Sequence, residues 1–373
     1  MKFTIIREEF LKALLNTSKI ILGKNSDPIL NNVKIDLFED HLEIIGSNGE
    51  ISIKSIVYKY KNDKTLIRDL TPGSILINAK MITEIVRKID AEEINFVVED
   101  NSTAKIQTLK SNFNLNVIRP EEYRELDFDE NGEQVTLSRD EFVNCINQTS
   151  FSASTKDNRP ILQCVNIESD GQSVHFTATD GARLARREVE LSLENRFSVN
   201  IPAKSLNEVV KSLLEEKQVS LFISEKKVLF KLDDCVITST IVVGDYPNTK
   251  NIIPHNYYYK LEVNSSEFLK TLDRIVLFSI DRENIVKLTM NEEEIIVSSR
   301  SQQVGDAKES LQLFKYSGER LQISFNVEYV SAAIRALKSD DVVLSFLGEM
   351  KPFTVTRKDD DKVIQLITPV RTY

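Results

Sequence analysis

The sequence has few cysteines and no long hydrophobic run. Cys145, Cys164 and Cys235 are too far apart in sequence for a local metal-binding knuckle, and their odd number argues against a disulfide framework. We therefore expect three free thiols. No segment approaches the roughly 18 uninterrupted apolar residues of a membrane helix, and residues 1–6 lead directly into polar sequence rather than into a signal-peptide core. These absences predict a soluble, cytoplasmic protein with no membrane partner.

The sequence motifs of catalysis are also missing. His41, His175 and His255 lie far apart without metal-ligand spacing, and there is no glycine-rich phosphate loop or Gly-x-Ser-x-Gly elbow. The acidic run at residues 359–361 could hold Mg²⁺ in a nuclease, but a charged hairpin tip is the stronger interpretation. We expect no enzymatic activity, no metal and no cofactor.

Length and composition indicate several globular domains. The chain has 373 residues, which is too many for one ordinary core. Hydrophobic residues make up 41% and charged residues 28%, which is ordinary for a folded protein. The net charge of −9 is unexpected for a nucleic-acid binder, because Lys and Arg supply most of the non-specific affinity for phosphates. The distribution of charge therefore matters more than its total.

One helix pattern occurs three times. A phenylalanine followed by aliphatic residues on one helical face is found at Phe10, Phe142 and Phe268, each preceded by a glutamate. The intervals are 132 residues (from 10 to 142) and 126 residues (from 142 to 268). Such intervals make the repeating unit a whole domain rather than a solenoid repeat. Ser265 and Ser266 are expected to cap the third copy.

A second amphipathic helix also recurs. Arg87, Lys211 and Arg335 hold its equivalent position, at intervals of 124 residues (from 87 to 211 and from 211 to 335). Each copy follows a short β-like run, and further β-like runs separated by turn residues fill the rest of the chain.

These patterns predict an α+β fold of three tandem similar domains. Each domain has two helices packed on one face of an antiparallel sheet. The polar, turn-rich stretch at 129–132 is typical of a linker. We expect domains at residues 1–131, 132–257 and 258–373.

Two short motifs connect this repeat to a known family. The run Thr179-Asp180-Gly181-Ala182-Arg183-Leu184 and the ending Thr368-Pro369-Val370-Arg371, set in three tandem units, resemble the beta subunit of bacterial DNA polymerase III, the beta sliding clamp family. The resemblance runs from Met1 to Arg371. It implies a DNA clamp fold in which two chains form a ring, with helices lining a central hole and sheets outside.

The resemblance also implies a function. Such a ring is a non-catalytic processivity factor of the replicative DNA polymerase, which encircles double-stranded DNA and slides without sequence specificity. The implied partners are a second copy of the chain, the polymerase alpha subunit, the clamp loader and other proteins that carry a clamp-binding motif. A scaffold that binds only proteins would share the repeat and remains the alternative.

Basic residues on the second helices are expected to contact DNA phosphates. A single Lys or Arg on a helix is usually solvated surface, but recurrence at a fixed interval favours a shared role. Family members also carry basic residues in two loops that touch DNA. The expected DNA-binding residues are Lys24, Arg87, Lys88, Arg159, Lys204, Lys211, Arg335 and Lys338.

The resemblance places a peptide-binding groove beside the Thr179-Asp180-Gly181 run, although this run alone could be a tight turn. Ala182 replaces a histidine that is frequent in the family, and Thr368 replaces a larger apolar residue. An apolar site with a few donors suits a Leu or Phe anchor. The implied groove residues are Leu162, Thr179, Gly181, Arg183, Leu184, Pro247, Ile252, Tyr329, Met350, Pro369, Val370 and Arg371.

The resemblance further implies a dimer interface between the first domain of one chain and the third domain of the other. Phe113 and Leu115 correspond to one side, and Leu277 and Phe278 to the other. The alternative is that all four are ordinary core residues.

Overall fold

The structure is a computed structural model that describes residues 1–21, 27–100, 102–156, 158–213, 216–249, 251–279 and 284–371. The chain separates into two compact units. Unit 1 consists of Met1–Asp140 and Glu208–Ile241, and unit 2 consists of Glu141–Asn207 and Val242–Tyr373. The boundaries at residues 140 and 207 fall within the ranges of helices α3 (Arg139–Thr149) and α4 (Ala203–Ser212).

Unit 1 contains a thirteen-stranded antiparallel sheet with the order β12-β17-β18-β19-β4-β3-β2-β8-β11-β10-β9-β1-β7, and a small hairpin of β5 and β6. The strands are β1 (Lys2–Ile6), β2 (Asn32–Leu37), β3 (His41–Ser47), β4 (Ile51–Tyr58), β5 (Tyr60–Lys61), β6 (Lys64–Thr65), β7 (Ile67–Thr71), β8 (Gly73–Asn78), β9 (Glu93–Glu99), β10 (Thr103–Gln107), β11 (Asn112–Ile118), β12 (Glu133–Ser138), β17 (Gln218–Ile223), β18 (Lys227–Lys231) and β19 (Cys235–Thr240).

Unit 2 contains a nine-stranded antiparallel sheet, β16-β13-β14-β15-β28-β27-β26-β20-β24, and a four-stranded one, β23-β22-β21-β25. The strands are β13 (Cys164–Ser169), β14 (Ser173–Thr179), β15 (Arg183–Glu190), β16 (Phe197–Pro202), β20 (Tyr259–Asn264), β21 (Ile285–Met290), β22 (Ile295–Ser301), β23 (Gly305–Ser310), β24 (Phe314–Ser317), β25 (Leu321–Asn326), β26 (Asp341–Phe346), β27 (Phe353–Arg357) and β28 (Asp360–Ile367).

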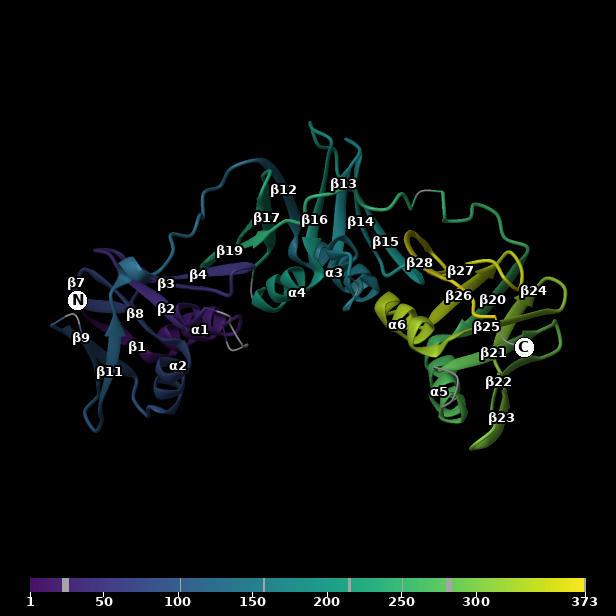
Figure 1. The fold of residues 1–373 in the computed structure, drawn as a ribbon, viewed down its shortest axis with the longest axis horizontal. Helices are drawn as coiled ribbons and strands as arrows, with labels where there is room; N and C mark the ends of the chain where they lie inside the picture. The colour runs from purple at the N-terminus through teal and green to yellow at the C-terminus, as the bar shows by residue number, and fades with distance from the viewer. Residues whose placement is uncertain are drawn as a thin grey trace. The chain divides into compact units, whose positions relative to one another are not determined.

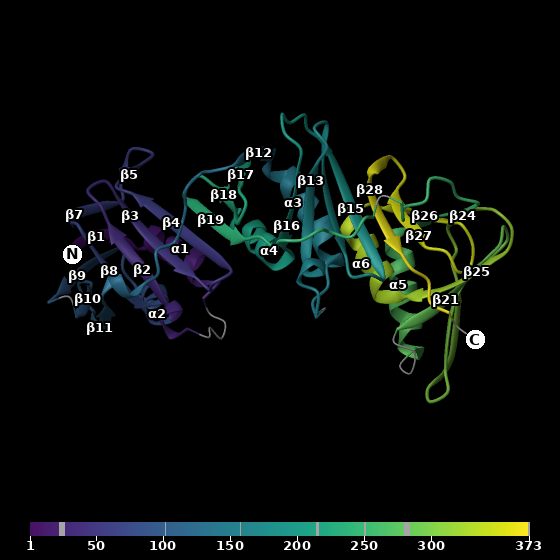
Figure 2. The ribbon, with the colours of Figure 1, turned by 45° about the horizontal axis from the view of Figure 1, so that its top comes forward.

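Both predicted helix repeats are confirmed. The first helices are α1 (Arg7–Ser18), α3 and α5 (Ser265–Ile275), and the second helices are α2 (Ala79–Lys88), α4 and α6 (Val327–Leu337). Each second helix follows directly on a strand, as the β-like runs predicted. Phe10, Phe142 and Phe268 are completely buried, because the repeated apolar face is the one that packs into the protein. Figures 1 and 2 show α1 and α2 against the strands of unit 1, and α5 and α6 against those of unit 2.

Asparagines cap three of these helices. The side chains of Asn78, Asn264 and Asn326 accept hydrogen bonds from backbone N–H groups in the first turns of α2, α5 and α6. The prediction that Ser265 and Ser266 cap α5 is wrong, because Asn264 accepts from Glu267 N–H and Ser265 is already helical. The strand before the helix fixes the capping position one residue earlier than the serine pattern suggested.

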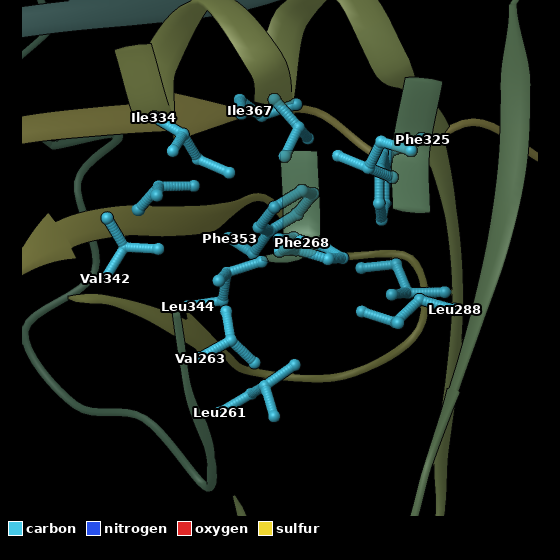
Figure 3. Close-up of a cluster of buried hydrophobic side chains, with 14 of the residues drawn as sticks. Leu261, Val263, Phe268, Leu288, Phe325, Ile334, Val342, Leu344, Phe353 and Ile367 are labelled. Carbon is cyan, nitrogen blue, oxygen red and sulfur yellow. The ribbon is translucent and has the colours of Figure 1, made fainter. Parts of the chain in front are cut away.

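The predicted third domain shows how sheet and helix share one core. Phe268 of α5 and Ile334 of α6 lie in the same buried cluster as Phe325 and Phe353 from the strands (Figure 3). The rings of Phe325 and Phe353 have centroids 5.7 Å apart. Burial of aromatic side chains of this size contributes about 1.5–3 kcal/mol each. This packing holds the helices to the sheet, and Thr271 and Arg274 of α5 add polar contacts to Glu309 of β23.

Two strand pairings join segments that are far apart in sequence. In unit 1, β19 pairs with β4, and Thr238 lies opposite Ser52. In unit 2, β28 pairs with β15, and Leu366 lies opposite Leu184. Both pairings are antiparallel.

The three cysteines are free and buried, as expected. Burial raises the pKa of the Cys145 and Cys235 thiols to about 12, so both are protonated at neutral pH. Within the described ranges, every helix is too short or too polar to cross a membrane.

Candidate functional site

Each second helix carries an exposed cation near its C-terminal end. The side chains of Arg87, Lys211 and Arg335 are 49%, 65% and 59% exposed. Each cation has an acidic neighbour: Arg87 pairs with Glu84, Lys211 with Glu208 at 2.8 Å, and Arg335 with Asp273 at 3.5 Å. Exposed ion pairs of this kind contribute little to stability. The three cations therefore remain available to an external anion.

The other basic candidates are also at the surface where the structure describes them. Lys88 ends α2, with Glu84 at 3.8 Å, and Lys204 is exposed in the first turn of α4. Lys338 follows α6 in a left-handed conformation with a φ of 50°. Arg159 is exposed immediately before the short helix η4 (Pro160–Gln163). Lys24 lies outside the described residues.

Residues 179–183 form a tight turn between β14 and β15, the conformation that the Asp-Gly pair by itself allowed. The Thr179 hydroxyl donates to Arg183 O at 2.6 Å and accepts from Gly181 N–H at 3.1 Å. The Asp180 Oδ1 atom accepts from the N–H groups of Ala182 and Arg183, both at 3.0 Å. Gly181 has a φ of +93°, which favours glycine. The turn is fixed by its own side chains.

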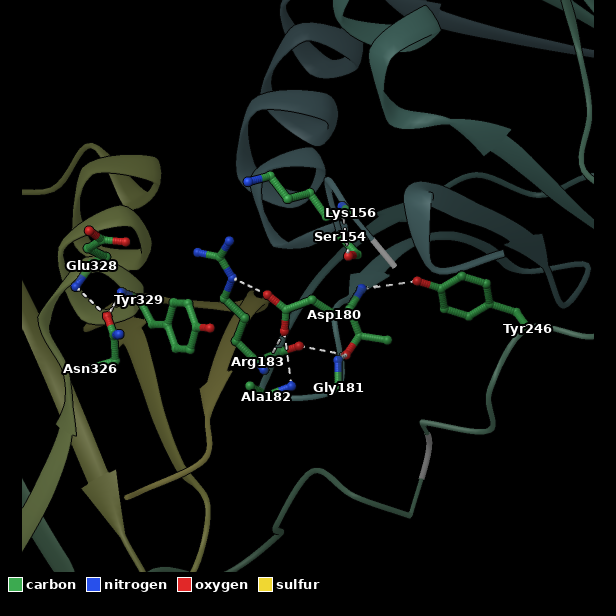
Figure 4. A network of polar contacts seen from close by, with 11 residues as sticks. Ser154, Lys156, Asp180, Gly181, Ala182, Arg183, Tyr246, Asn326, Glu328 and Tyr329 are labelled. Atoms are coloured by element: carbon green, nitrogen blue, oxygen red, sulfur yellow. Dashed lines mark hydrogen bonds and ion pairs between the residues drawn. The ribbon is translucent and has the colours of Figure 1, made fainter. Parts of the chain in front are cut away.

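The Arg183 side chain is held by protein groups rather than pointing into solvent. Its Nε donates to Asp180 Oδ2 at 3.0 Å, and its side chain is 16% exposed. The guanidinium lies over the ring of Tyr329 at 4.6 Å and near the ring of Phe151 at 5.5 Å. Figure 4 shows it between Asp180 and Tyr329. Cation–π contacts of this geometry are worth about 0.5–2 kcal/mol, so Arg183 links the turn to the start of α6.

The last described residues run beside the same turn. Thr368 N–H donates to Ala182 O at 3.0 Å, and Val370 N–H donates to Ser324 O at 2.7 Å. Leu184 forms a buried cluster with Ile253 and Leu366. Pro369 is buried, Val370 is half-buried and Arg371 is exposed. The structure thus brings the two sequence motifs together, although 184 residues (from 184 to 368) separate them.

The remaining groove candidates lie on neighbouring segments. Leu162 is buried in η4, Pro247 is exposed beside Tyr246, and Ile252 and Met350 are 47% and 54% exposed. In the described part of the chain, no hydrogen bond or ring contact links Leu162, Ile252 or Met350 to the turn. Exposed apolar side chains such as those of Ile252 and Met350 suit an apolar ligand.

The four interface candidates are not core residues. Phe113 on β11 is 37% exposed, and Leu115 lies on the same face of that strand and is half-buried. Leu277 is 63% exposed, and Phe278 is half-buried, both in the short helix η5 (Val276–Phe278). Large exposed apolar side chains of this kind are typical of an interface.

His41, His175 and the acidic run 359–361 each lie among their own local partners. His41 stacks on Phe38, and His175 is buried between Asp170 and Glu188. The described residues include no group of three or more His, Cys, Asp or Glu side chains that could hold a metal. The acidic run 359–361 lies at the β27–β28 hairpin, as expected, and Asp360 accepts from Arg187 at 2.7 Å.

Comparison with known families decides the assignment. The N-terminal domain of the DNA polymerase III beta subunit matches residues 1–127, its central domain matches 136–248 and its C-terminal domain matches 250–371. The chain belongs to the DNA polymerase III beta subunit family. The predicted clamp fold of three tandem similar domains is thereby confirmed.

Relatives and solved structures of this family match over their full length. The beta sliding clamps of Bacillus subtilis and Staphylococcus epidermidis are 35% and 34% identical, with all of both chains covered. The crystal structure of the Bacillus subtilis DNA polymerase sliding clamp has a TM-score of 0.96 at 35% identity. That of a DNA polymerase III beta chain from Streptococcus pneumoniae has a TM-score of 0.95 at 30% identity. Both structures are covered completely, as is this chain.

The sequence analysis did not identify two side chains that contact the turn 179–183. Phe151 contributes a ring beside Arg183, and the Tyr246 hydroxyl accepts a hydrogen bond from Thr179 N–H and donates one to Cys164 O. Tyr246 is adjacent to Pro247, which was a candidate, so a tyrosine beside that proline was the available signal. Phe151 follows α3 without any motif, and only the fold reveals its position.

Proposed function

We propose that two copies of this chain close into a ring around double-stranded DNA. The chain is a processivity factor of the sliding-clamp type, the role that its relatives' names carry. One observation carries the proposal. Equivalent strands pair twice within the chain, as β4 with β19 and as β15 with β28, and the third equivalent pair, β11 and β23, is left with unpaired edges.

The open edges follow from counting strands. β4, β15 and β23 are each the third strand after a first helix, and β11, β19 and β28 are each the third strand after a second helix. β19 pairs with β4 and β28 pairs with β15. In the described chain, β23 ends its sheet, and residues 112–116 of β11 pair on one side only, with β10. A second copy can therefore pair its β23 with β11, and the reciprocal contact closes a ring.

The internal repeat also predicts the register of this joint. Asn114 corresponds to Thr238, because each lies four residues after a two-residue turn, at 109–110 and 233–234. Ser52 corresponds to Asp306, because three successive strand pairings connect each of them to the residue immediately before the second helix of its domain. Since Thr238 faces Ser52, Asn114 would face Asp306 of the partner subunit.

Disulfide cross-linking tests that register. Asn114→Cys combined with Asp306→Cys should give a covalent dimer on oxidation, because facing residues of paired strands lie within disulfide distance. Asn116→Cys with Asp306→Cys is the matched control, displaced by two residues along the strand, and should cross-link poorly. The native cysteines are buried and should not interfere. Equal yields from both pairs would rule out the register.

Apolar side chains would extend the joint beyond the strands. Phe113 and Leu115 project from β11, and Leu277 and Phe278 are exposed or half-buried in η5. We assign the first pair to one side of the dimer interface and the second pair to the other.

The recurring cations would face DNA. Arg87, Lys211 and Arg335 are exposed and paired only with exposed or half-buried carboxylates, which phosphate oxygens can replace. Lys88, Lys204, Lys338, Arg159 and Lys24 complete the proposed set. Contacts to phosphates carry no sequence information, which suits a ring that slides.

The turn 179–183 and the segment 368–371 would receive a linear peptide motif. The main chain is fixed, and Ile252 and Met350 offer exposed apolar surface. We propose the replicative polymerase alpha subunit, the clamp loader and other motif-bearing proteins as occupants.

We also propose domain boundaries near residues 131 and 257, a cytoplasmic location, and the absence of enzymatic activity.

Retention on DNA tests the ring. The protein, loaded by its clamp loader, should stay on closed circular duplex DNA at a salt concentration that releases ordinary basic proteins, and it should be lost when the circle is cut. Equal loss from circular and linear DNA would exclude a topological link. A scaffold that binds only proteins would bind the motif peptide and would not be retained on either DNA.

A further inference from the structure

Tyr246 is a half-buried tyrosine whose hydroxyl joins two main-chain groups. Its oxygen accepts from Thr179 N–H at 3.0 Å, and its proton is donated to Cys164 O at 3.5 Å. Burial raises the pKa of the phenol, so the hydroxyl keeps its proton at neutral pH. A protonated phenol can donate and accept at the same time. Tyr246 therefore ties the end of β14 to the start of β13 through a side chain that belongs to neither strand.

The bond to Thr179 acts on the first residue of the turn 179–183. The Thr179 hydroxyl reaches across the turn to Arg183 O, and the Arg183 guanidinium is stacked on Tyr329. The turn is thus held at its first residue by Tyr246 and at its last residue by Tyr329. Figure 4 shows the two tyrosines on opposite sides of the turn.

We infer that Tyr246 is a positioning residue of the peptide groove, because it holds the turn in the conformation that receives the peptide. This inference rests on the proposed function of that groove. Without the hydroxyl, the Thr179 N–H loses its partner and the main chain of the turn gains other conformations. Peptide binding would then have to order the turn first, which weakens affinity without removing any contact to the peptide.

The variant Tyr246→Phe tests the inference in the full-length protein. The probe is a fluorescently labelled peptide with one leucine and one phenylalanine anchor, and its dissociation constant is measured by fluorescence anisotropy. We expect a 5- to 20-fold weaker affinity, roughly the effect of one buried hydrogen bond lost with its donor left unsatisfied. Tyr257→Phe is the matched control: it removes a hydroxyl that donates to Pro254 O at 3.1 Å rather than to a residue of the turn. Its affinity should equal that of the unsubstituted protein.

Amide hydrogen exchange separates positioning from general stability. In Tyr246→Phe, the Thr179 amide should exchange faster, while amides in the β12–β17 pairing should not change. Faster exchange at Thr179 with unchanged peptide affinity would overturn the inference, because the tyrosine would then serve the fold alone. Unchanged exchange and affinity would also overturn it. If the unsubstituted protein fails to bind the peptide, the groove itself is wrong and the inference falls with it.

Discussion

The surroundings of a single side chain decide whether it can serve a ligand. Arg183 was a candidate peptide donor because of its type and position, but its guanidinium is bonded to Asp180 and stacked on Tyr329. Ala182 differs from Arg183, because only its main-chain groups take part in the contacts of the turn. Its main-chain groups are bonded to Asp180 and Thr368, and its half-buried side chain makes none of these contacts. Residue 182 can therefore vary without disturbing the turn.

Ala182→His should change the peptide preference of the groove. The larger side chain narrows the site beside Thr368 while the turn keeps its hydrogen bonds. We expect the ratio of affinities for leucine- and phenylalanine-anchored peptides to shift by about threefold or more. Isothermal titration calorimetry with the two peptides measures this ratio. An unchanged ranking would show that residue 182 does not line the site.

Asp170 should make a small acid-dependent contribution to stability. Its carboxylate accepts from the backbone N–H groups of Gln172 and Ser173, and these bonds lower its pKa to about 2 from the usual 3.8. A carboxyl whose folded pKa is depressed stabilises the fold above its unfolded pKa, and this stabilisation is lost as the pH falls from about 4 towards 2. Because Asp170 is at the surface, we expect only about 0.5 kcal/mol.

The variant Asp170→Asn isolates this contribution. The amide oxygen can still accept from the backbone but does not ionise, so the stability difference from the unsubstituted protein should be constant above pH 5 and shrink below pH 4. Urea unfolding at several pH values measures it. A difference that grows with falling pH would have the wrong sign for this mechanism.

At the scale of elements, the junction from strand to second helix is the most regular feature of the chain. In two of the three junctions an asparagine ends the strand and caps the helix: Asn78 before α2 and Asn326 before α6. Pro202 stands at the corresponding place before α4. The cap fixes where the helix begins, and in α6 it therefore also fixes Tyr329, which stacks on Arg183.

Asn326→Ala should destabilise the start of α6. The Asn326 side chain accepts from Glu328 N–H at 2.8 Å and from Tyr329 N–H at 3.4 Å, and loss of such a cap costs about 1 kcal/mol. Chemical denaturation followed by circular dichroism should show this loss, and the amides of Glu328 and Tyr329 should exchange faster. Asn256→Ala, at an exposed position, is the control. Equal stability of both variants would contradict the capping role.

For the whole molecule, the total charge does not decide whether the second helices can contact DNA. The net charge is −9, but the second helices present Arg87, Lys211 and Arg335 to solvent. Electrostatic attraction to phosphates depends on the charges that face them and is screened within about 8 Å at physiological salt. Acidic residues farther away than this need not prevent contact with DNA.

Replacing these three cations with glutamate should weaken DNA association and leave the dimer intact. We expect a lower affinity for duplex DNA and a shallower dependence of log affinity on log salt, because fewer counterions are released. Filter binding across a salt series measures both. The control replaces Lys226, Lys260 and Lys287, which are exposed and lie on strands or a strand turn, with glutamate. Equal effects in the two variants would mean that total charge, not placement, governs binding.

Periodicity in the sequence was sufficient for the helices and the domain repeat. Helices at Phe10, Phe142 and Phe268 and their partners at 85–89, 209–213 and 333–337 follow from apolar spacing, because each must bury one face. The cap of α5 was predicted at the wrong residue. Ser265 and Ser266 match the preference for capping residues, but the helix begins directly after the strand, so Asn264 is the cap. Local sequence defines faces well and boundaries less well.

Residue types and their spacing along the chain were sufficient to predict the family, the three-domain repeat, the possible tight turn at 179–183 and the recurring cations. The fold was needed to show that Thr368 bonds to Ala182, that Arg183 is stacked on Tyr329 and Phe151, and that Tyr246 holds Thr179. These contacts join segments 32 to 186 residues apart (from 151 to 183 up to 182 to 368). No local pattern encodes such contacts, because they arise when strand pairing and core packing bring distant residues together.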